Sequence, residues 1–197
     1  MKKVIPIKGK CTKIFLIRHA STPWKKFGFL SGTDVELDKK GIEEAKGLGL
    51  KFKGKKIDAI FSSPSKRTLA TANEIAKRHS LDVKIREELR EVDFGIFEGL
   101  SLEEAKNKFP RIYKKRKEDK WNYPIPKGES YKMAYDRVKR FLEIIKKNYK
   151  GKTVLIVTHA TLIKLMLKSI LNKPLEEVET NYIKEASCIE IDVRNYT

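Results

Sequence analysis

The sequence predicts an α/β protein: a three-layer α/β/α sandwich with a mostly parallel central sheet and a small helical cap insert. Short apolar runs alternate with helix-like stretches along the chain, which is the pattern of strand-helix-strand units. Residues 13–18, 58–62 and 153–158 are nearly continuous apolar runs, as in parallel strands covered on both faces. A chain of 197 residues can bury a substantial core, so we expect residues 1–197 to form a single domain.

The strands and the first helices follow in order along the chain. Capping residues mark the helix starts: one helix begins near Asp38 and a second near Ser63-Pro64, where serine can cap and proline suits the first turn. Ser101 and Glu104 have the spacing of a capping box. The predicted strands are residues 13–18, 58–62, 83–86, 153–158 and 187–193.

Two longer helices flank the fourth strand. Ser130 opens a helix whose apolar residues fall on one stripe, namely Ala134, Val138, Phe141, Leu142, Ile145 and Tyr149. The helix that follows His159 is apolar nearly all round, so we expect it to be central and buried. Residues 100–130 are expected to form the cap insert, and residues 1–11 a basic N-terminal extension.

The composition is strongly basic. Lys and Arg number 44 against 26 Asp and Glu, which gives a formal charge of +18 and a pI near 9.8. Such an excess suits acidic ligands or nucleic acid, but no stretch alternates aromatic residues with a basic face as a single-strand binder would. The Lys-rich sequence contains no Gln, which resembles a thermophile's composition, although a codon-biased genome could produce it too. We expect no nucleic-acid partner.

Cysteine content and hydropathy favour a soluble, cytoplasmic protein. Cys11 and Cys188 are too few for a disulfide scaffold and lack metal-ligand spacing. The first ten residues lack the apolar segment that a signal peptide requires. The apolar stretch 162–171 is too short to span a bilayer and contains Lys164 and Lys168. We therefore expect no membrane partner and leave the oligomeric state open, with a dimer among the options.

Three strand exits carry cations and imidazoles. Arg18-His19 follows the first strand, Arg67 lies in the first turn of the helix after the second, and His159-Ala160 follows the fourth. If these strands are parallel neighbours, two Arg, two His and two helix N-termini share one end of the sheet. Helix N-termini and the guanidinium fork both suit phosphate, so the sequence predicts a phosphate site there.

A single His or Arg at a strand end is more often structural than functional, and the joint occurrence is what supports a site. Two of the three histidines directly follow apolar strands. His79, at the end of a predicted helix, is expected to be a surface or C-cap residue without a functional role.

The chain resembles the histidine phosphatase superfamily, the phosphoglycerate-mutase-like group, and within it the short branch of α-ribazole phosphatases and broad-specificity phosphatases. The resemblance covers most of the chain, and its motifs occur in the family order. They are residues 16–22 for the nucleophile motif, 62–72 for the second-arginine motif, 89–99 for the acid motif, and 128–130 and 157–160.

The resemblance implies a role for each of five residues. His19 would be the nucleophile that forms a phosphohistidine, Arg18 and Arg67 would hold the phosphoryl oxygens, and His159 would donate a hydrogen bond to the same group. Glu91 would protonate the leaving alkoxide. Elementary chemistry agrees, because a nucleophilic imidazole needs a fixed neutral tautomer and preorganised cations can stabilise the transferring group without a metal. We expect no metal and no cofactor.

The family pattern also places Thr22, Lys25, Ser31, Gly32 and Ala160 among the substrate-binding residues. Lys25 stands where members commonly carry Asn, and Ser31-Gly32 stands where Gln-Gly is frequent. For residues 25 and 31, a role in substrate binding and a simple surface position therefore explain the sequence equally well. Ala20 and Ala160 replace residues that are often Gly. Both are small, so backbone donation to phosphate is expected to survive.

The choice of Glu91 rests on the motif. It follows Leu89 by two residues and precedes Gly95 by four, and its competitors in the same segment are Glu87, Glu88, Asp93 and Glu98. In the cap insert, the basic run 114–117 is better explained as a solvated face than as a ligand clamp, whereas Trp121 and Tyr123 could wall a substrate pocket.

These observations predict a metal-independent phosphomonoesterase that acts through phosphohistidine on a small phosphorylated metabolite of the α-ribazole phosphate, phosphoserine or sugar phosphate type. A phosphoglycerate mutase is the first alternative, and residues 93–99 and the absence of a longer insertion argue against it. A catalytically silent phospho-ligand binding module is the second. The joint presence of His19, Glu91 and His159 argues against that module, because binding alone needs only the arginines.

Overall fold

The computed structural model describes residues 11–24, 30, 34–180 and 182–193, and its described part contains a five-stranded sheet. The spatial order of the strands is β3-β2-β4-β1-β5. β1, β2, β3 and β4 are parallel, and β5 pairs with β1 in the antiparallel sense. The strands are β1 (Thr12–Arg18), β2 (Ala59–Ser62), β3 (Val83–Ile85), β4 (Thr153–Thr158) and β5 (Cys188–Val193).

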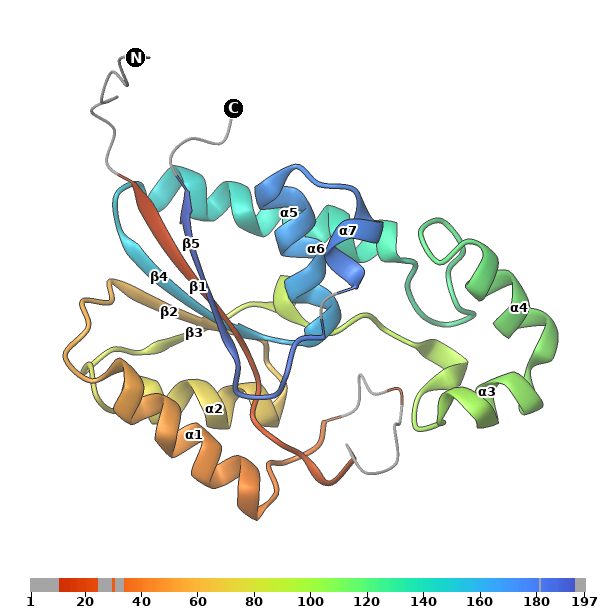
Figure 1. The fold of residues 1–197 in the computed structure, drawn as a ribbon, viewed down its shortest axis with the longest axis horizontal. Coiled ribbons are helices and arrows are strands. Elements are labelled where there is room, and N and C mark those ends of the chain that lie inside the picture. The colour runs from red at the N-terminus through yellow and green to blue at the C-terminus, as the bar shows by residue number, and fades with distance from the viewer. Residues whose placement is uncertain (1–10, 25–29, 31–33, 181, 194–197) are drawn as a thin grey trace.

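Helices cover both faces of this sheet, which confirms the predicted three-layer α/β/α class (Figure 1). α1 (Lys39–Phe52) and α2 (Lys66–Ala76) lie on one face. α5 (Tyr131–Asn148) and α6 (Ala160–Leu171) lie on the other, with the short α7 (Leu175–Glu179) beside α6.

Alternate residues of each strand supply two separate cores, because successive strand side chains point to opposite faces. Ile14 and Leu16 of β1 pack with α5 and α6, whereas Phe15 and Ile17 pack with α1 and α2. Of the 12 residues of α6, five are buried (Leu162, Ile163, Leu165, Met166 and Leu167), so this helix is central as predicted. Both faces of β1 are therefore buried, which explains its continuous apolar run.

Most of the predicted helix starts agree with the observed caps. The side chain of Asp38 accepts from the N–H of Gly41, and that of Ser130 accepts from Met133. Ser101 and Glu104 form the complete capping box of α3 (Leu102–Lys108). The start of α2 differs from the prediction, because Ser65 and not Ser63 is its N-cap residue. The hydroxyl of Ser63 instead forms a hydrogen bond with His159.

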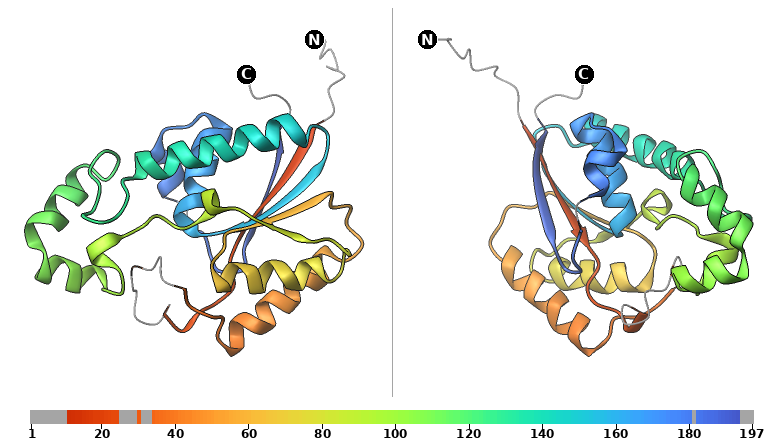
Figure 2. Two further views of the ribbon diagram at one scale, coloured as in Figure 1. Left: turned by 180° about the vertical axis from the view of Figure 1, so that it is seen from behind. Right: turned by 45° about the vertical axis from the view of Figure 1, so that its right-hand side comes forward.

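The segment predicted as a cap insert stands to one side of the sheet in every view (Figure 2). It contains α3 and α4 (Pro110–Glu118), and Pro110 occupies the first turn of α4. Phe97, Ala105 and Ile125 form a small buried cluster under these helices, separate from the two sheet cores. This cluster fixes the segment to the loop that carries the acid motif.

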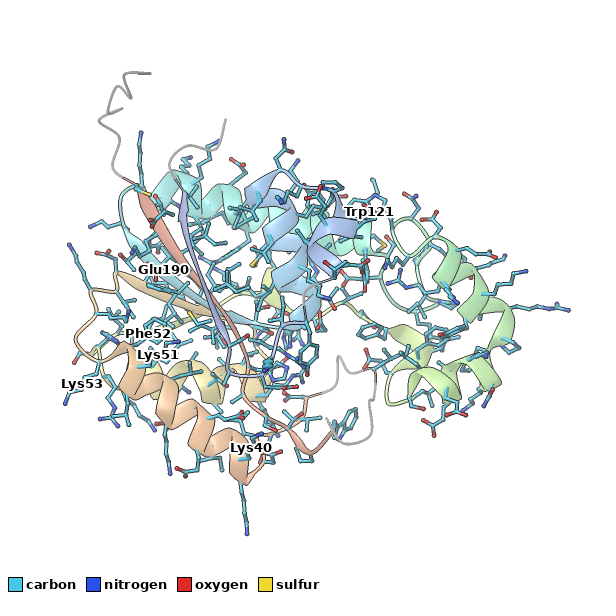
Figure 3. The ribbon with its side chains drawn as sticks, viewed as in Figure 1. Lys40, Lys51, Phe52, Lys53, Trp121 and Glu190 are labelled. Atoms are coloured by element: carbon cyan, nitrogen blue, oxygen red, sulfur yellow. The ribbon has the colours of Figure 1, made fainter. Side chains whose placement is uncertain are left out.

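The lysines that make the chain basic lie mainly on its surface. Lys40, Lys51 and Lys53 are exposed around α1, whereas Phe52 between them is buried (Figure 3). Several lysines pair with carboxylates on the same helix, for example Lys40 with Glu44 and Lys46 with Glu43. Among the described helices, none is both long and apolar enough to cross a membrane.

Candidate active site

The exits of three neighbouring parallel strands meet at one edge of the sheet. His19 follows β1, Ser63 follows β2 and His159 follows β4. Backbone hydrogen bonds join the three exits: the N–H of His19 donates to Thr158 O at 3.0 Å, and the N–H of Ser63 donates to Val157 O at 3.1 Å. The sheet thus brings both predicted histidines together, with ring centroids 5.4 Å apart.

His19 is buried, with 7% of its surface exposed, and its ring has a defined tautomer. Its Nδ1 lies 2.8 Å from the carbonyl oxygen of Ala20. A carbonyl can only accept, so Nδ1 carries the proton and Nε2 keeps its lone pair. Burial and, next, the charge of Arg67 lower the pKa of His19 to about 3. The hydrogen bond to the Ala20 carbonyl opposes this shift, and Arg18 adds a smaller lowering effect on the pKa. The ring is therefore neutral at physiological pH.

His159 has the opposite tautomer. Its Nδ1 lies 3.2 Å from a terminal nitrogen of Arg67, and because a guanidinium only donates, Nδ1 is the acceptor. Its Nε2 therefore carries the proton and donates to Ser63 Oγ at 2.9 Å. Burial and, next, the charge of Arg67 hold the pKa of His159 well below its usual range. This ring is a neutral N–H donor.

The two predicted arginines are held in different ways. Arg67 lies in the first turn of α2 and is 3% exposed. Burial lowers its pKa, and the charge of Glu91 opposes that effect. Arg18 is partly buried: its Nη1 donates to Ile183 O at 2.6 Å and its Nη2 pairs with Glu185 at 3.0 Å. Each guanidinium is thus oriented before any ligand binds.

Glu91 lies beside these groups, on the loop after the 3-10 helix Glu87–Leu89. One carboxylate oxygen accepts from its neighbour's N–H (Val92, 3.0 Å) and the other from Thr161 at the N-terminus of α6 (3.4 Å). Burial raises the pKa of Glu91 above its ordinary value, and those two hydrogen bonds oppose the rise. The loop thus presents a carboxyl group with increased affinity for a proton.

The competing carboxylates bond back to the acid-motif segment itself. The carboxylate of Asp93 is exposed and accepts from Gly95, that of Glu98 accepts from Phe94, and Glu87 pairs with Arg90. The geometry therefore distinguishes Glu91, which contacts α6, from these three.

The family profile of the histidine phosphatase superfamily (branch 1) matches residues 14–197, nearly the whole chain. The chain belongs to this superfamily.

Three similar proteins illustrate the relationship. Phosphoserine phosphatase 1 of Hydrogenobacter thermophilus is 34% identical over 166 residues, which are 84% of this chain and 79% of that protein. The structure of a phosphoserine phosphatase from Entamoeba histolytica, in complex with 3-phosphoglyceric acid, is 30% identical, with a TM-score of 0.80 over 91% of this chain and 89% of that one. The α-ribazole phosphatase of Shigella flexneri shares the fold, with a TM-score of 0.84, 24% identity and coverage of 91% and 90%.

Membership identifies the chain as a phosphatase of the histidine type. The predicted substrate-binding residues of this histidine phosphatase are only partly described. Thr22 is buried and lies three residues after His19 in the chain. Ala160 is the first residue of α6. Lys25, Ser31 and Gly32 lie outside the described residues.

The Ala20 N–H, expected as a donor to phosphate, has a partner within the protein. The N–H of Ala20 donates to the hydroxyl of Thr71 at 3.1 Å, so it is engaged within the protein and not directed at a ligand. The side chain of Thr71 in turn donates to Arg67 O at 2.7 Å. The Ala20 N–H therefore helps to link the β1 exit to α2.

Sequence reasoning missed three partners of the predicted site residues. The hydroxyl of Ser63 accepts the Nε2 proton of His159, and Ile183 and Glu185 hold Arg18. A signal existed for Ser63, because a serine directly after an apolar strand is placed at the same sheet edge as the two histidines. None existed for Glu185, which is more than 160 residues from Arg18.

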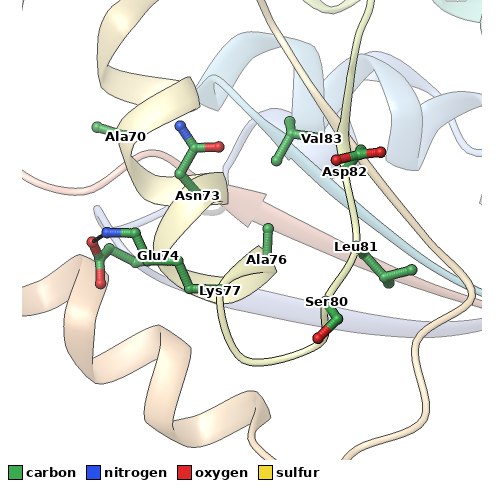
Figure 4. A pocket seen from close by; sticks show the side chains of 9 residues that line it. All are labelled: Ala70, Asn73, Glu74, Ala76, Lys77, Ser80, Leu81, Asp82 and Val83. Atoms are coloured by element: carbon green, nitrogen blue, oxygen red, sulfur yellow. Dashed lines mark hydrogen bonds and ion pairs between the residues drawn. The ribbon is translucent and has the colours of Figure 1, made fainter.

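The histidine phosphatase has no metal-binding cluster of three or more His, Cys, Asp or Glu residues in the part of the chain that the structure describes. A hollow of about 610 Å³ lies away from the histidines, between α2 and β3 (Figure 4). Its lining includes Asp82 and the ion pair of Glu74 with Lys77. Two carboxylates against one ammonium do not suit a phosphate group.

Proposed function

We propose that this histidine phosphatase is a phosphomonoesterase that works through a phosphohistidine on a small phosphorylated metabolite. One observation carries the proposal: two neutral histidines of opposite tautomer lie side by side, with ring centroids 5.4 Å apart, and the charges of Arg67 and Arg18 act on both rings. His19 offers a lone pair. His159 carries an N–H at Nε2, which donates to Ser63 Oγ in this structure and would turn to a phosphoryl oxygen when substrate binds. Nucleophilic attack on a phosphorus atom needs the first, and stabilisation of its oxygens needs the second.

In the first half-reaction, Nε2 of His19 forms a bond to phosphorus while the bond to the leaving oxygen breaks. Arg18, Arg67 and His159 would donate to the three non-bridging oxygens of the phosphoryl group, where charge accumulates. The Nε of Arg18 is buried and makes no hydrogen bond within the described structure, so a phosphoryl oxygen would satisfy it. Protonated Glu91 would give its proton to the leaving alkoxide.

In the second half-reaction, ionised Glu91 would take a proton from water as the water oxygen attacks phosphorus. The bond between phosphorus and Nε2 breaks, inorganic phosphate leaves, and the electron pair returns to His19. Glu91 ends protonated, as it began. The same carboxyl thus serves as acid and then as base, which a raised pKa favours.

Catalysis should not require a divalent metal. Two arginines already supply the positive charge that a metal would supply, and they would repel a metal cation. We expect hydrolysis of 4-nitrophenyl phosphate to continue at an unchanged rate after exhaustive chelation with EDTA. A loss of activity that Mg²⁺, Mn²⁺ or Zn²⁺ restores would contradict the mechanism.

The surroundings of Glu91 support a substrate whose alcohol carries a second anionic group. Lys120 and Lys164 both bind Glu179, the first its carboxylate and the second its carbonyl oxygen at 2.8 Å. Arg116 donates to Lys120 O. Burial lowers the pKa of Lys164, and Glu179 and Lys120 have the next largest effects. Glu91 and Arg18 also shift this pKa, so the ammonium lies within electrostatic range of the site. Lys120 pairs with a carboxylate, whereas Lys164 and Arg116 donate to backbone carbonyls, so positive charge is in excess beside the proposed leaving-group acid.

This charge excess favours phosphoserine among the α-ribazole phosphate, phosphoserine and sugar phosphate types, because phosphoserine carries a carboxylate. Two of the similar proteins are phosphoserine phosphatases, which agrees with that choice. A panel of phosphorylated metabolites, with a mutase assay on 3-phosphoglycerate beside it, tests the proposal. Interconversion of the phosphoglycerates without release of phosphate would favour the mutase instead.

Lys164→Gln should raise KM for O-phosphoserine about tenfold, the typical value of one charge-assisted hydrogen bond. O-Phosphoethanolamine lacks only the carboxylate, so its KM should not change. Lys168→Gln, a half-buried lysine one turn further along α6, is the matched control. An equal rise for both substrates would mean that Lys164 does not recognise the carboxylate.

A further inference from the structure

Arg137 and Glu129 form an ion pair next to the loop that carries Glu91. Arg137 lies on α5, and Glu129 directly precedes the N-cap residue of that helix. The guanidinium meets the carboxylate with two donors, Nε to Oε1 at 3.0 Å and Nη2 to Oε2 at 2.9 Å. Both side chains are largely buried, at 12% and 21% exposed, so this pair is better shielded from solvent than a surface salt bridge.

The remaining donors of Arg137 bind the backbone of the loop that carries Glu91. Nη1 donates to Glu88 O at 2.7 Å, and Nη2 donates to Glu91 O at 3.1 Å. Glu129 binds the same loop further on: its carboxylate accepts from the N–H of Asp93 at 3.2 Å, and its own N–H donates to Asp93 O at 2.8 Å. The pair therefore forms hydrogen bonds with this loop on both sides of the Glu91 side chain.

The loop has little regular structure of its own to hold it in place. Between the 3-10 helices Glu87–Leu89 and Gly95–Phe97 it belongs to no strand of the sheet. It also passes close to the loop before α5: a Cβ on Gly95 would lie 2.2 Å from Pro126 O, and one on Gly128 would lie 2.5 Å from Asp93 O. Two glycines thus permit the approach that lets Glu129 and Arg137 reach the loop.

We propose that Arg137, with Glu129, is a positioning residue that sets the location of the Glu91 carboxyl group relative to the leaving oxygen. This inference rests on the proposed function, because it assumes that Glu91 is the general acid. Displacement of a catalytic group by about 1 Å can cost on the order of a hundredfold in rate. Three side-chain hydrogen bonds from this one pair hold the loop, so the loop is sensitive to the loss of the pair.

Arg137 also acts on the site through its charge, since its guanidinium contributes to the lowered pKa of His159. Charge and position can be separated experimentally. Arg137→Lys keeps the positive charge but loses the planar fork that serves Glu129, Glu88 and Glu91 together. A positional role therefore requires the lysine variant to be impaired, whereas a purely electrostatic role requires it to be active.

The test is pre-steady-state formation of the phosphoenzyme from two esters, O-phosphoserine, with a poor leaving group, and 4-nitrophenyl phosphate, with a good one. Misplacement of an acid slows the first far more than the second. We expect Arg137→Lys to slow the serine ester tenfold or more, on the order expected for a misplaced catalytic group, and the aryl ester by less than about twofold. Arg140→Lys, at an exposed position on the same helix, should behave as wild type.

The double variant with Glu91→Gln completes the test. If Arg137 acts through Glu91, adding Arg137→Lys to Glu91→Gln produces no further selective loss. An equal loss on both esters, or a selective loss that persists without the Glu91 carboxyl, would overturn the proposal. Should Arg137→Lys fail to fold, Glu129→Gln is expected to give the same selectivity, and its absence there would overturn the proposal equally. Wild-type protein that forms no phosphoenzyme from either ester would instead refute the proposed function.

Discussion

His19→Ala is expected to abolish turnover, with a loss on the order of 10⁴-fold or more, because no other group can form the bond to phosphorus. The nearest ring, His159, has its Nδ1 lone pair occupied by Arg67 and presents a proton at Nε2. The measurement is hydrolysis of 4-nitrophenyl phosphate together with trapping of an acid-labile phosphoprotein from a radiolabelled substrate. The variant should incorporate no label.

The fold should survive this substitution. The imidazole of His19 makes one hydrogen bond, to the adjacent Ala20 carbonyl, and its loss removes a group that is desolvated beside two cations. The melting temperature and circular dichroism check this expectation. His79→Ala is the matched control, since His79 lies near the end of α2 away from the strand exits and should retain wild-type activity. Substantial turnover by His19→Ala, or wild-type turnover without a phosphohistidine, would refute the mechanism.

Glu91→Gln should slow cleavage of an alkyl phosphate on the order of a hundredfold, the usual contribution of a general acid, and slow an aryl phosphate much less. The reason is the leaving group: nitrophenolate departs without a proton, whereas a serine alkoxide does not. Rapid-quench measurement of phosphoenzyme formation isolates this step from the later attack of water. An equal effect on both esters would mean that Glu91 is not the acid and would direct attention to Asp93 or Glu98.

The pH dependence gives a second readout of the same residue. Glu91 must be protonated to act as the acid, and burial raises its pKa, so phosphoenzyme formation from an alkyl ester falls as the pH rises through that raised value. His19 imposes no limit in the same range, because its pKa of about 3 leaves the free enzyme's ring neutral throughout. In Glu91→Gln the alkaline decline should disappear.

The sequence was sufficient for the features that depend on strand order and apolar pattern. Arg67 and His159 could be placed next to His19 because each follows an apolar run, and parallel neighbouring strands end at one edge. Glu91 could not be singled out by pattern, because carboxylates at 87, 88, 93 and 98 have the same local character. Its choice came from the family motif, and its burial against α6 is a tertiary property.

The supporting contacts were beyond sequence reasoning for a related reason. Arg137 resembles an ordinary polar residue of an amphipathic helix, and nothing local shows that its guanidinium donates to the backbone of a loop some 46 residues earlier. The start of α2 was misplaced because Ser63 and Ser65 are both good capping residues. The hydrogen bond from His159 to Ser63 decides between them, and that bond forms only when β2 and β4 are side by side.

The position of β1 between β4 and β5 has a consequence for how the protein forms during synthesis. The strand that ends at the nucleophile is made first, but its two sheet neighbours begin only at Thr153 and Cys188. Until β4 and β5 emerge from the ribosome, the apolar run of β1 has no partner, and Arg18 lacks the carboxylate of Glu185. Strands that are so distant in sequence pair slowly, and until they pair their unpaired edges are exposed and prone to aggregation. We therefore expect nascent chains that stop before β5 to be inactive and prone to aggregation, so that activity arises only when synthesis is nearly complete.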